Sequence, residues 1–382
     1  MREDWDIRLF KDVFDLQMGK TPDRKNFSLF EGDNTWVSIK DLDGKYISSS
    51  KECISDEAAK NIKLVKRGTV IMSFKLTVGK TAIAGKDLYT NEAIMAFNLR
   101  NGYDIDASFL YYYLKNYRWE GSNKAVMGIT LNKATISKHK IAIPPKPTQL
   151  SIVTELDKLN ELIQIKKEQL KDYDALAQSI FYEMFGDPVV NEKGWEVKKL
   201  KDISRKIGDG LHGTPEYSEL DTGWYFINGN NLEDGCISIK STTKKVTDSV
   251  RKKYYIEMDD FTLLVSINGT LGKSAFYNGE NVILGKSACY IKLNKDVNKL
   301  FIYEIIRGEY FKRYAESVCT GTTIRNVSLK AMREFPIIYP SLSLQQSFAH
   351  KIEQIEQQKA AIQKTITDLE TLLAARMQYW FD

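Results

Sequence analysis

The chain repeats itself: motifs in its first half return in the same order in its second half, 190 to 193 residues later. The matching pairs are WDIRLFKDV from Trp5 and WEVKKLKDI from Trp195, SFKLTVGKT from Ser73 and SINGTLGKS from Ser266, FLYYYLK from Phe109 and FIYEIIR from Phe301, and GITLNKATI from Gly128 and GTTIRNVSL from Gly321. Chance can supply one or two such matches, but not an ordered series. A duplicated sequence predicts two similar folded parts.

Both copies of the second motif end in Gly-Lys followed by Thr or Ser, which is also the ending of phosphate-binding loops. Such a loop needs a glycine five positions before its Gly-Lys, because backbone N–H groups must wrap the phosphates. Here those positions hold Phe74 and Ile267. Bulky side chains do not make that tight turn cheaply. The sequence therefore disfavours a nucleotide hydrolase, an alternative that measured ATP hydrolysis would revive.

Each half begins with a mixed globular part. The β-branched and aromatic runs GTVIMSF and FTLLVSI predict strands, and FLYYYLKNY predicts an amphipathic helix. The aromatic side chains in and after this helix could stack on the bases of a single strand; they are Tyr111, Tyr112, Tyr113, Tyr117 and Trp119. The second half keeps apolar residues here, such as Ile305 and Ile306. A buried helix face is therefore the favoured interpretation.

Each half then reaches prolines, in IPPKP at 143–147 and IIYP at 337–340, after which the pattern changes to a long helix. Apolar residues recur in steps of three and four, the signature of a coiled coil. The coiled-coil positions are Ile152, Leu156, Leu159, Ile163, Leu170, Ile352, Ile355, Ile362, Ile366 and Leu369, and the stripe is interrupted by Lys166, Lys359 and Arg376. Ser151 and Ser347 suit helix starts. The segment FGDP at 185–188 suits a helix stop, because Gly can adopt the left-handed conformation and Pro cannot continue the helix.

The predicted fold class is α+β. We expect two similar mixed α/β domains, residues 1–147 and 187–342, and two long helices, residues 148–186 and 343–382. Helices of near-equal length can bury their stripes on each other, and the short connections favour an antiparallel coiled coil. The first helix is about 48 Å long from Ile152 to Met184, at roughly 1.5 Å per residue. The alternative is that each helix packs on its own domain.

The composition limits the class of protein. A length of 382 residues, 43% apolar and 27% charged, is typical of a globular protein with two or three domains. The net charge of +5 permits nucleic acid as a partner without demanding it. Four cysteines and three histidines show no zinc spacing, so no metal site is expected. The sequence shows neither a signal peptide nor a membrane span, which favours reduced thiols in a cytoplasmic protein.

Over essentially its whole length the chain resembles the specificity subunit of type I restriction–modification systems. The resemblance rests on the W-(D/E)-(I/V)-(R/K) opening of each half, the inner TVGKT and TLGKS, the closing Gly-Thr-like and Ile-Pro-Pro residues, and the long helices. The most specific segment is SIFYEMFGDP at 179–188, followed by Trp195. Family members often show Pro-Pro-Leu-x-Glu-Gln before the helix. Here Gln149 and Gln345 keep the last position of that pattern, and its Glu is absent.

The resemblance implies a DNA-binding subunit that performs no chemistry in a prokaryotic cytoplasm. Each globular half is then a target-recognition domain that reads one half of a split double-stranded DNA site. The helices space the two domains and dock two adenine-N6 methyltransferase (M) subunits, and restriction/translocase (R) subunits complete the complex. No cofactor is expected on this chain; S-adenosylmethionine, ATP and Mg are expected on the partner subunits. Accordingly, the chain has no Asn/Asp-Pro-Pro-Tyr/Phe segment of the kind that methyltransferases use.

Polar loops of each half supply candidate DNA contacts, because Lys and Arg bind phosphates while Arg, Asn, Ser and Thr can read base edges. The candidates are Lys20, Thr21, Arg24, Lys25, Lys40, Lys75, Lys80, Asn132 and Lys133 in the first half, and His212, Thr214, Asn230, Asn268, Lys273, Arg325 and Asn326 in the second. For each of these residues, the alternative is that it is a solvated loop residue that does not contact DNA. These loops differ between the halves, so unlike half-sites are expected. A coiled-coil scaffold that binds only protein is the alternative function.

Overall fold

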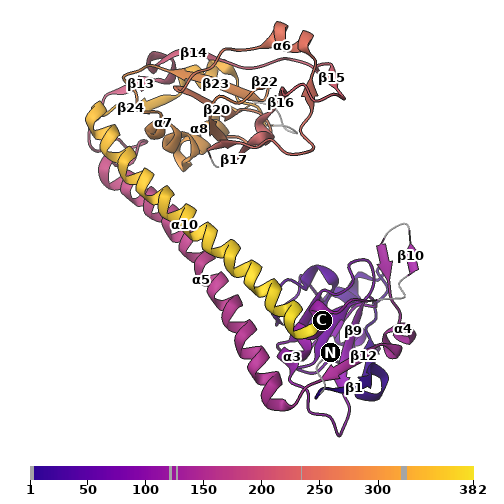
Figure 1. Cartoon of the computed structure of the whole chain (residues 1–382). Coiled ribbons are helices and arrows are strands. Elements are labelled where there is room, and N and C mark those ends of the chain that lie inside the picture. The colour runs from indigo at the N-terminus through magenta and orange to yellow at the C-terminus, as the bar shows by residue number, and fades with distance from the viewer. Residues whose placement is uncertain (1–3, 120–122, 126–127, 234, 320–324) are drawn as a thin grey trace. The chain divides into compact units, whose positions relative to one another are not determined.

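The computed structural model describes residues 4–119, 123–125, 128–233, 235–319 and 325–382. The chain divides into two compact units. Unit 1 comprises Met1–Glu168 and Gln363–Asp382, and unit 2 comprises Gln169–Ile362. Each of the two long helices, α5 (Lys146–Phe185) and α10 (Leu342–Phe381), therefore contributes one segment to each unit. Figure 1 shows the elements of both units.

Unit 1 contains a five-stranded sheet in the order β2-β9-β6-β7-β4 and a three-stranded sheet in the order β5-β3-β8. Two further pairs are β1 with β12 and β10 with β11. The strands are β1 (Asp6–Leu9), β2 (Phe14–Met18), β3 (Asn34–Val37), β4 (Tyr46–Ile47), β5 (Glu52–Ile54), β6 (Val70–Ser73), β7 (Thr81–Ala84), β8 (Tyr89–Thr90), β9 (Ile94–Leu99), β10 (Asn123–Ala125), β11 (Gly128–Thr130) and β12 (Lys140–Ile143). The helices are α1 (Phe10–Val13), α2 (Asp56–Ala59), α3 (Ala107–Asn116), α4 (Lys133–Lys138) and the 3-10 turns η1 (Phe27–Phe30) and η2 (Ile39–Asp41).

Unit 2 contains two four-stranded sheets, in the orders β14-β23-β20-β21 and β15-β19-β16-β22. β13 pairs with β24, and β17 with β18. The strands are β13 (Val197–Lys199), β14 (Ser204–Gly208), β15 (Tyr217–Ser218), β16 (Tyr225–Ile227), β17 (Leu232–Glu233), β18 (Cys236–Ile237), β19 (Lys245–Val246), β20 (Thr262–Ser266), β21 (Ser274–Phe276), β22 (Val282–Leu284), β23 (Ala288–Leu293) and β24 (Pro336–Ile338). The helices are α6 (Asp248–Tyr254), α7 (Lys299–Arg307), α8 (Glu309–Val318), α9 (Leu329–Glu334) and the 3-10 turns η3 (Leu200–Ile203) and η4 (Gly229–Asn231).

The two units share one sheet plan, which confirms the predicted duplication. The order β2-β9-β6-β7 of unit 1 returns as β14-β23-β20-β21 in unit 2. β6 and β7 form an antiparallel hairpin, as do β20 and β21, and β3 runs parallel to β8 as β16 does to β22. The runs predicted as strands are β6 and β20. The second copy of the last repeated motif begins at Gly321, and its first four residues lie outside the described residues.

The aromatic run belongs to the core of unit 1, as its apolar counterpart in the second half suggested. Tyr111, Tyr112 and Tyr113 of α3 are 7%, 2% and 7% exposed. Tyr117 and Trp119 are partly buried against the same core, and both contact Phe10. These rings are therefore not an exposed platform for stacking bases.

Both long helices begin earlier than predicted. They start at Lys146 and Leu342, whereas the predicted helices begin at residues 148 and 343. Ser151 and Ser347 lie inside the helices, so the expectation that these serines mark the helix starts was wrong. Proline is compatible with the first turn of a helix, where backbone N–H groups have no intrahelical partner, so Pro147 does not delay the start. The predicted stop was right: α5 ends at Phe185, and Gly186 has a φ of 76°.

Two buried glutamines attach these helix starts to the globular parts. Gln149 is 1% exposed; its Oε1 accepts a hydrogen bond from Asp106 N at 2.8 Å, and its Nε2 donates to Pro144 O at 3.0 Å and Asp104 O at 3.1 Å. Asp106 is the N-cap residue of α3.

Gln345 repeats the arrangement in unit 2. It is 0% exposed, accepts from Asn298 N at 3.0 Å and donates to Pro340 O at 2.9 Å. Asn298 is the N-cap residue of α7. Each glutamine therefore joins the first turn of a long helix to the start of the helix that carries the repeated aromatic or apolar motif.

Within each unit the α5 and α10 segments contact each other. In unit 1, Arg376 Nη2 donates to Glu155 Oε2 at 3.0 Å, and Lys167 pairs with Glu370 at 2.8 Å. Since the residue numbers rise along one helix as they fall along the other, the segments are antiparallel. In unit 2, Lys359 pairs with Asp174 of α5 at 2.9 Å.

The charges at Lys359 and Arg376, which interrupt the apolar stripe, therefore each meet a carboxylate on the facing helix. Around them, the buried stripe positions are Ile152, Leu156, Leu159, Ile163, Ile352, Ile355 and Ile366, and the half-buried ones are Leu170, Ile362 and Leu369. A polar group at a stripe position favours one register, because any other register leaves the charge without its partner.

The ends of both helices also belong to the cores of the units. Ile152 and Leu156 lie in the core of unit 1, together with partly buried Trp380 and Phe381. Phe185, Phe348 and Ile352 lie in the core of unit 2. The helices thus pack on each other and on the globular parts, so the two arrangements considered from the sequence coexist.

Replacing Glu155 by Gln should lower the free energy of unfolding at neutral pH and make it less sensitive to acid. The hydrogen bond from Arg376 lowers the pKa of Glu155, and Trp380 Nε1 also donates to this carboxylate at 2.9 Å. A carboxylate with a lowered folded pKa stabilises above its ordinary pKa of about 4.3 and loses that contribution as the pH falls through its folded pKa.

Because both partners are about one-third exposed, we expect a loss of about 1 kcal/mol or less at pH 7. Urea unfolding of the wild type and Glu155→Gln at a series of pH values checks this. The two free energies should converge as the pH falls below about 4. A difference that stays constant with pH would contradict an ionic contribution.

Candidate nucleic-acid interface

The Gly-Lys motif of each unit forms a turn inside a β-hairpin. In unit 1 it joins β6 to β7, where Ser73 N donates to Lys80 O at 2.8 Å and Gly79 N donates to Ser73 O at 2.9 Å. In unit 2 the corresponding bonds run from Ser266 N to Lys273 O at 2.7 Å and from Gly272 N to Ser266 O at 3.0 Å. A phosphate-binding loop joins a strand to a helix instead. The duplicated turn therefore explains the motif without a nucleotide site.

Left-handed backbone shapes both turns. Gly79 and Gly272 have φ values of 90° and 79°, a region that glycine enters without steric cost. Leu76 in the first turn also has a positive φ, 62°, and its side chain is 63% exposed. A non-glycine residue in this region is uncommon and marks a turn whose shape is imposed by its surroundings.

The structure brings the predicted residues of the last repeated motif next to these turns. In unit 1, Leu131 N donates to Phe74 O at 2.9 Å, which places Asn132 and Lys133 near the turn that carries Lys75 and Lys80. Asn132 itself caps α4, because its side chain accepts from Thr135 N at 2.8 Å. That contact gives Asn132 a structural role.

Unit 2 shows the same neighbourhood. Asn268 and Asn326 form an isolated antiparallel bridge, and Gly269 N donates to Arg325 O at 2.9 Å. Arg325 pairs with Glu316 at 3.0 Å, where both side chains are more than half exposed. Lys273 lies in the same turn as Asn268.

A second group of predicted residues lies in the loop after β2. Arg24 forms two hydrogen bonds to Glu52, at 2.5 and 2.9 Å, and its guanidinium lies 4.4 Å from the Phe30 ring centroid and 5.0 Å from that of Trp36. The Arg24 hydrogen bond lowers the pKa of Glu52. Arg24 is therefore held in place by protein contacts.

The predicted residues near Arg24 have side chains with fewer protein contacts. Trp36 Nε1 donates to Lys20 O at 3.1 Å and fixes the backbone, while the Lys20 side chain is exposed. Thr21 Oγ1 donates to Glu92. Lys25 and Lys40 are also exposed, and Lys40 lies on η2.

The remaining candidates of unit 2 are exposed. His212 Nε2 lies 2.7 Å from Asp209 Oδ2, and its side chain is 70% exposed. Thr214 follows in the same loop, and Asn230 lies on η4. η4 approaches the end of β20 closely, because a Cβ on Gly229 would lie 2.2 Å from Ser266 Oγ. This brings Asn230 into the surroundings of the second turn.

Each turn also borders a hollow whose other residues were not among the predicted contacts. The hollow in unit 1 has a volume of about 320 Å³ and includes Lys80, Tyr111 and Lys115. The hollow in unit 2 has a volume of about 310 Å³ and includes Lys273, Tyr303 and Arg307. A signal was present in the sequence, because Lys115 and Arg307 are the seventh residues, and the tyrosines the third, of FLYYYLK and FIYEIIR.

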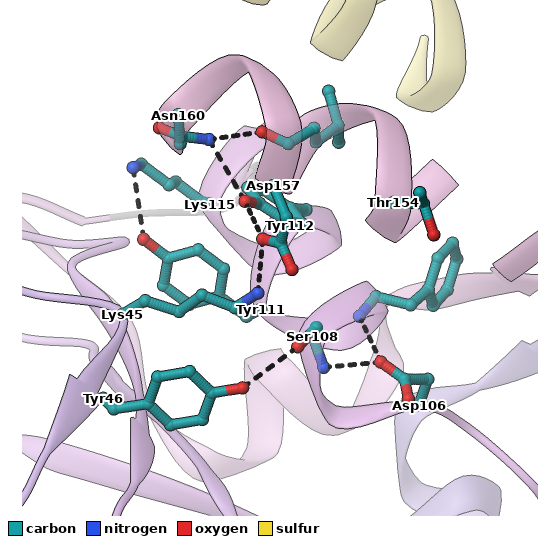
Figure 2. A network of polar contacts seen from close by, with 12 residues as sticks. Lys45, Tyr46, Asp106, Ser108, Tyr111, Tyr112, Lys115, Thr154, Asp157 and Asn160 are labelled. Carbon is teal, nitrogen blue, oxygen red and sulfur yellow. Dashed lines mark hydrogen bonds and ion pairs between the residues drawn. The ribbon is translucent and has the colours of Figure 1, made fainter. Parts of the chain in front are cut away.

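A polar network fixes the helix beside the first hollow (Figure 2). Asp157 Oδ1 of α5 accepts from Tyr112 Oη and from Lys45 Nζ, each at 2.5 Å, and Asn160 Nδ2 donates to Tyr112 Oη at 3.1 Å. Burial, together with the neighbouring Asp157 carboxylate, raises the pKa of Tyr112. Lys45 is therefore committed to Asp157. Lys115 Nζ lies 3.3 Å from Tyr111 Oη in the same view.

The chain contains two copies of one domain, and each copy has a turn with a lysine and polar loops that differ from those of the other copy. This arrangement is that of a recognition protein with two modules. The profile of the type I restriction modification DNA specificity domain matches the chain twice, over residues 2–172 and 192–371. The chain therefore belongs to the family of type I restriction–modification specificity subunits. Its role is recognition of a DNA target, and it is a specificity subunit and not a catalytic one. Nothing in these comparisons supports the scaffold alternative.

Two relatives come from Methanocaldococcus jannaschii. The chain is 27% identical to the type I restriction enzyme MjaIX specificity subunit over 314 residues, which cover 76% of this chain and 68% of that subunit. It is 20% identical to the putative type I restriction enzyme MjaX specificity subunit over 388 residues, which cover 93% of this chain and 87% of that subunit.

Two solved structures share the fold. The S subunit of a type I restriction–modification system from M. genitalium matches with a TM-score of 0.53 and 16% identity, covering 99% of this chain and 96% of that one. A chain from a study of complex assembly and conformational transition of the type I R-M system matches with a TM-score of 0.66 and 16% identity, covering 100% and 98%. Among the described residues, no helix has the length and hydropathy required to cross a membrane.

Proposed function

We propose that this chain reads an asymmetric, bipartite DNA target, one half with each copy of the duplicated domain. The observation that carries the proposal is one sheet plan with different polar loops. The loop after β2 presents Lys20, Arg24 and Lys25, whereas the loop after β14 presents His212 and Thr214. Base edges are distinguished by the donors and acceptors that reach them. Different loop chemistry on one scaffold therefore favours two unlike half-sites.

The predicted polar contacts remain candidates for this readout. Arg24 and Asn132 are the weakest of them, because protein groups already use their hydrogen bonds. The exposed side chains of Lys20, Lys25 and Thr214 are better placed to meet a ligand. Phosphate contacts would position the duplex, and the shorter polar side chains would specify sequence.

We further propose that α5 and α10 set the distance between the half-sites and dock two adenine-N6 methyltransferase subunits, to which restriction/translocase subunits add. S-adenosylmethionine, ATP and Mg would then be bound by those partners, in a prokaryotic cytoplasm. Exposed apolar side chains along both helices support a docking role. They are Leu150, Ile165, Leu176, Tyr182, Leu342, Leu372 and Tyr379.

Co-expression with a methyltransferase subunit, followed by mapping of methylated adenines in the host DNA, tests the proposal. We expect methylation within a single motif that has two specified parts, an unspecified middle and no palindromic symmetry. Co-expression of the methyltransferase subunit alone is the control and should leave those adenines unmodified. A palindromic or continuous motif, or methylation that is independent of this chain, would contradict the proposal.

A further inference from the structure

The hollows beside the two Gly-Lys turns are built from equivalent residues of the two repeats. The first is lined by Leu42, Asp43, Gly44, Val78, Gly79, Lys80, Thr81, Tyr111 and Lys115. The second is lined by Leu232, Glu233, Gly272, Lys273, Ser274, Tyr303 and Arg307. Three separate segments supply the same kinds of residue to each hollow. The Gly-Lys turn supplies Gly-Lys followed by Thr or Ser, and the segment after η2 or η4 supplies Leu followed by Asp or Glu. The helix α3 or α7 supplies a tyrosine and a cationic side chain.

The two repeated lysines are not among the buried residues of either unit. Lys80 is exposed and Lys273 half-buried, and within the described part of the chain neither ammonium group donates a hydrogen bond or lies within ion-pair distance of a carboxylate. Repeated core residues are explained by the shared fold. A repeated lysine that is exposed in one copy and half-buried in the other is not explained in this way, because most surface positions tolerate substitution within about 0.5 kcal/mol.

The second cation of each hollow is held by its neighbours. Lys115 lies against Tyr111, with Nζ 5.4 Å from the ring centroid. Arg307 pairs with Glu304 at 3.3 Å and with Asp174 at 3.4 Å. Lys115 adds positive potential to the first hollow, whereas the charge of Arg307 is partly offset by its two carboxylate partners. Lys80 and Lys273 keep their donors available for a ligand.

Each hollow also contains one carboxylate, which two cations outnumber. Glu233 pairs with Lys240 at 3.1 Å, so its charge is offset inside the protein. Asp43 is the corresponding group of the first hollow. With one carboxylate against two cations, each set of lining side chains carries a net charge of about +1 at neutral pH.

We propose that each hollow contacts one backbone phosphate of the DNA through Lys80 or Lys273, with Lys115 or Arg307 supplying the supporting field. This inference rests on the proposed function and adds that different parts of each domain bind the DNA backbone and read its sequence. The hollows are alike and so bind what both half-sites share, which is the phosphodiester backbone. The loops around them differ and read what the half-sites do not share. A lysine is a point charge suited to a phosphate rather than to one base edge.

The test measures how DNA affinity depends on salt for the full-length chain in complex with its methyltransferase subunit. Lys80→Ala and Lys273→Ala should each reduce the slope of log affinity against log salt by about 1, and the double variant by about 2. The loss of affinity should be the same for the mapped target and for a scrambled duplex. Lys80→Arg and Lys273→Arg should restore the slope, because the charge is kept.

Matched controls are Lys60→Ala in unit 1 and Lys295→Ala in unit 2. Both lysines are exposed and neither lines either of the two hollows beside the turns, so the slopes of their variants should stay at the wild-type value. Unchanged circular dichroism and thermal melting would show that all variants fold.

Three outcomes would overturn the inference, and they can be told apart. If the wild-type complex does not bind DNA, the proposed function is contradicted as well. If the target is bound normally and the lysine variants keep the wild-type salt slope, only the proposed phosphate contacts are contradicted. Unchanged slopes together with weaker assembly with the methyltransferase subunit would show that the hollows bind a protein carboxylate instead.

Discussion

Inserting seven residues into both long helices should lengthen the unread middle of the DNA target and leave both half-sites unchanged. The insertions would be placed after Glu168 in α5 and after Ile362 in α10, where the chain passes between its compact units. Seven residues preserve the 3.5-residue stripe and add about 10 Å of helix. At about 3.4 Å per base pair, we expect a spacer that is longer by up to about three base pairs. Mapping of methylated adenines in cells that carry the variant measures both features.

The same insertion in α5 alone is the control and should abolish targeted methylation. It moves one α5 segment by two turns against its α10 partner, so the pairs Glu155–Arg376 and Asp174–Lys359 can no longer form together. Altered half-site sequences in the double insertion would contradict the proposed spacer role. So would an unchanged spacer, because distance would then be set by something other than these helices.

Replacing Gln149 by Ala should destabilise unit 1 strongly, by about 2–4 kcal/mol. The change leaves the N–H of Asp106 and the carbonyl groups of Asp104 and Pro144 without their buried partner. An unpartnered buried polar group costs about 1–3 kcal/mol. Gln345→Ala should have the equivalent effect in unit 2 through Asn298 and Pro340.

Hydrogen–deuterium exchange of the full-length chain resolves these effects by region. Gln149→Ala should accelerate exchange at the start of α3 and in the first turn of α5, and Gln345→Ala at the start of α7 and in the first turn of α10. Gln358→Ala is the matched control, because Gln358 is an exposed residue of α10. Its exchange should stay within the wild-type range. Faster exchange spread evenly over both units would contradict the idea that each glutamine attaches a long helix to its unit locally.

The repeat was readable from the sequence because the motifs that define it are local. Strand runs, the Gly-Lys turns and the 3.5-residue stripes each depend on a few neighbouring residues. They predicted β6, β20, α3 and the long helices. The helix starts were missed because a serine is a common N-cap, whereas here the first turns contain Pro147 and the buried glutamines. Their hydrogen bonds from Asp106 N and Asn298 N come from 43 and 47 residues away, beyond any local pattern.

The candidate site was predicted only in part. Polar residue types in loops selected Lys80 and Lys273, but the same criterion also selected Arg24 and Asn132, whose hydrogen bonds serve the protein. Lys115 and Arg307 were passed over because they lie in the last turn of helices whose other residues are mostly buried.

By itself, the sequence determined that this protein has two copies of one domain and two striped helices, because periodicity and duplication are recorded in residue order. The tertiary structure alone decided which side chains meet. It placed Arg376 against Glu155 and Lys359 against Asp174, and it gathered three distant segments around each repeated lysine. The physical reason is that contacts between side chains follow from packing, and packing joins residues that the chain itself keeps far apart.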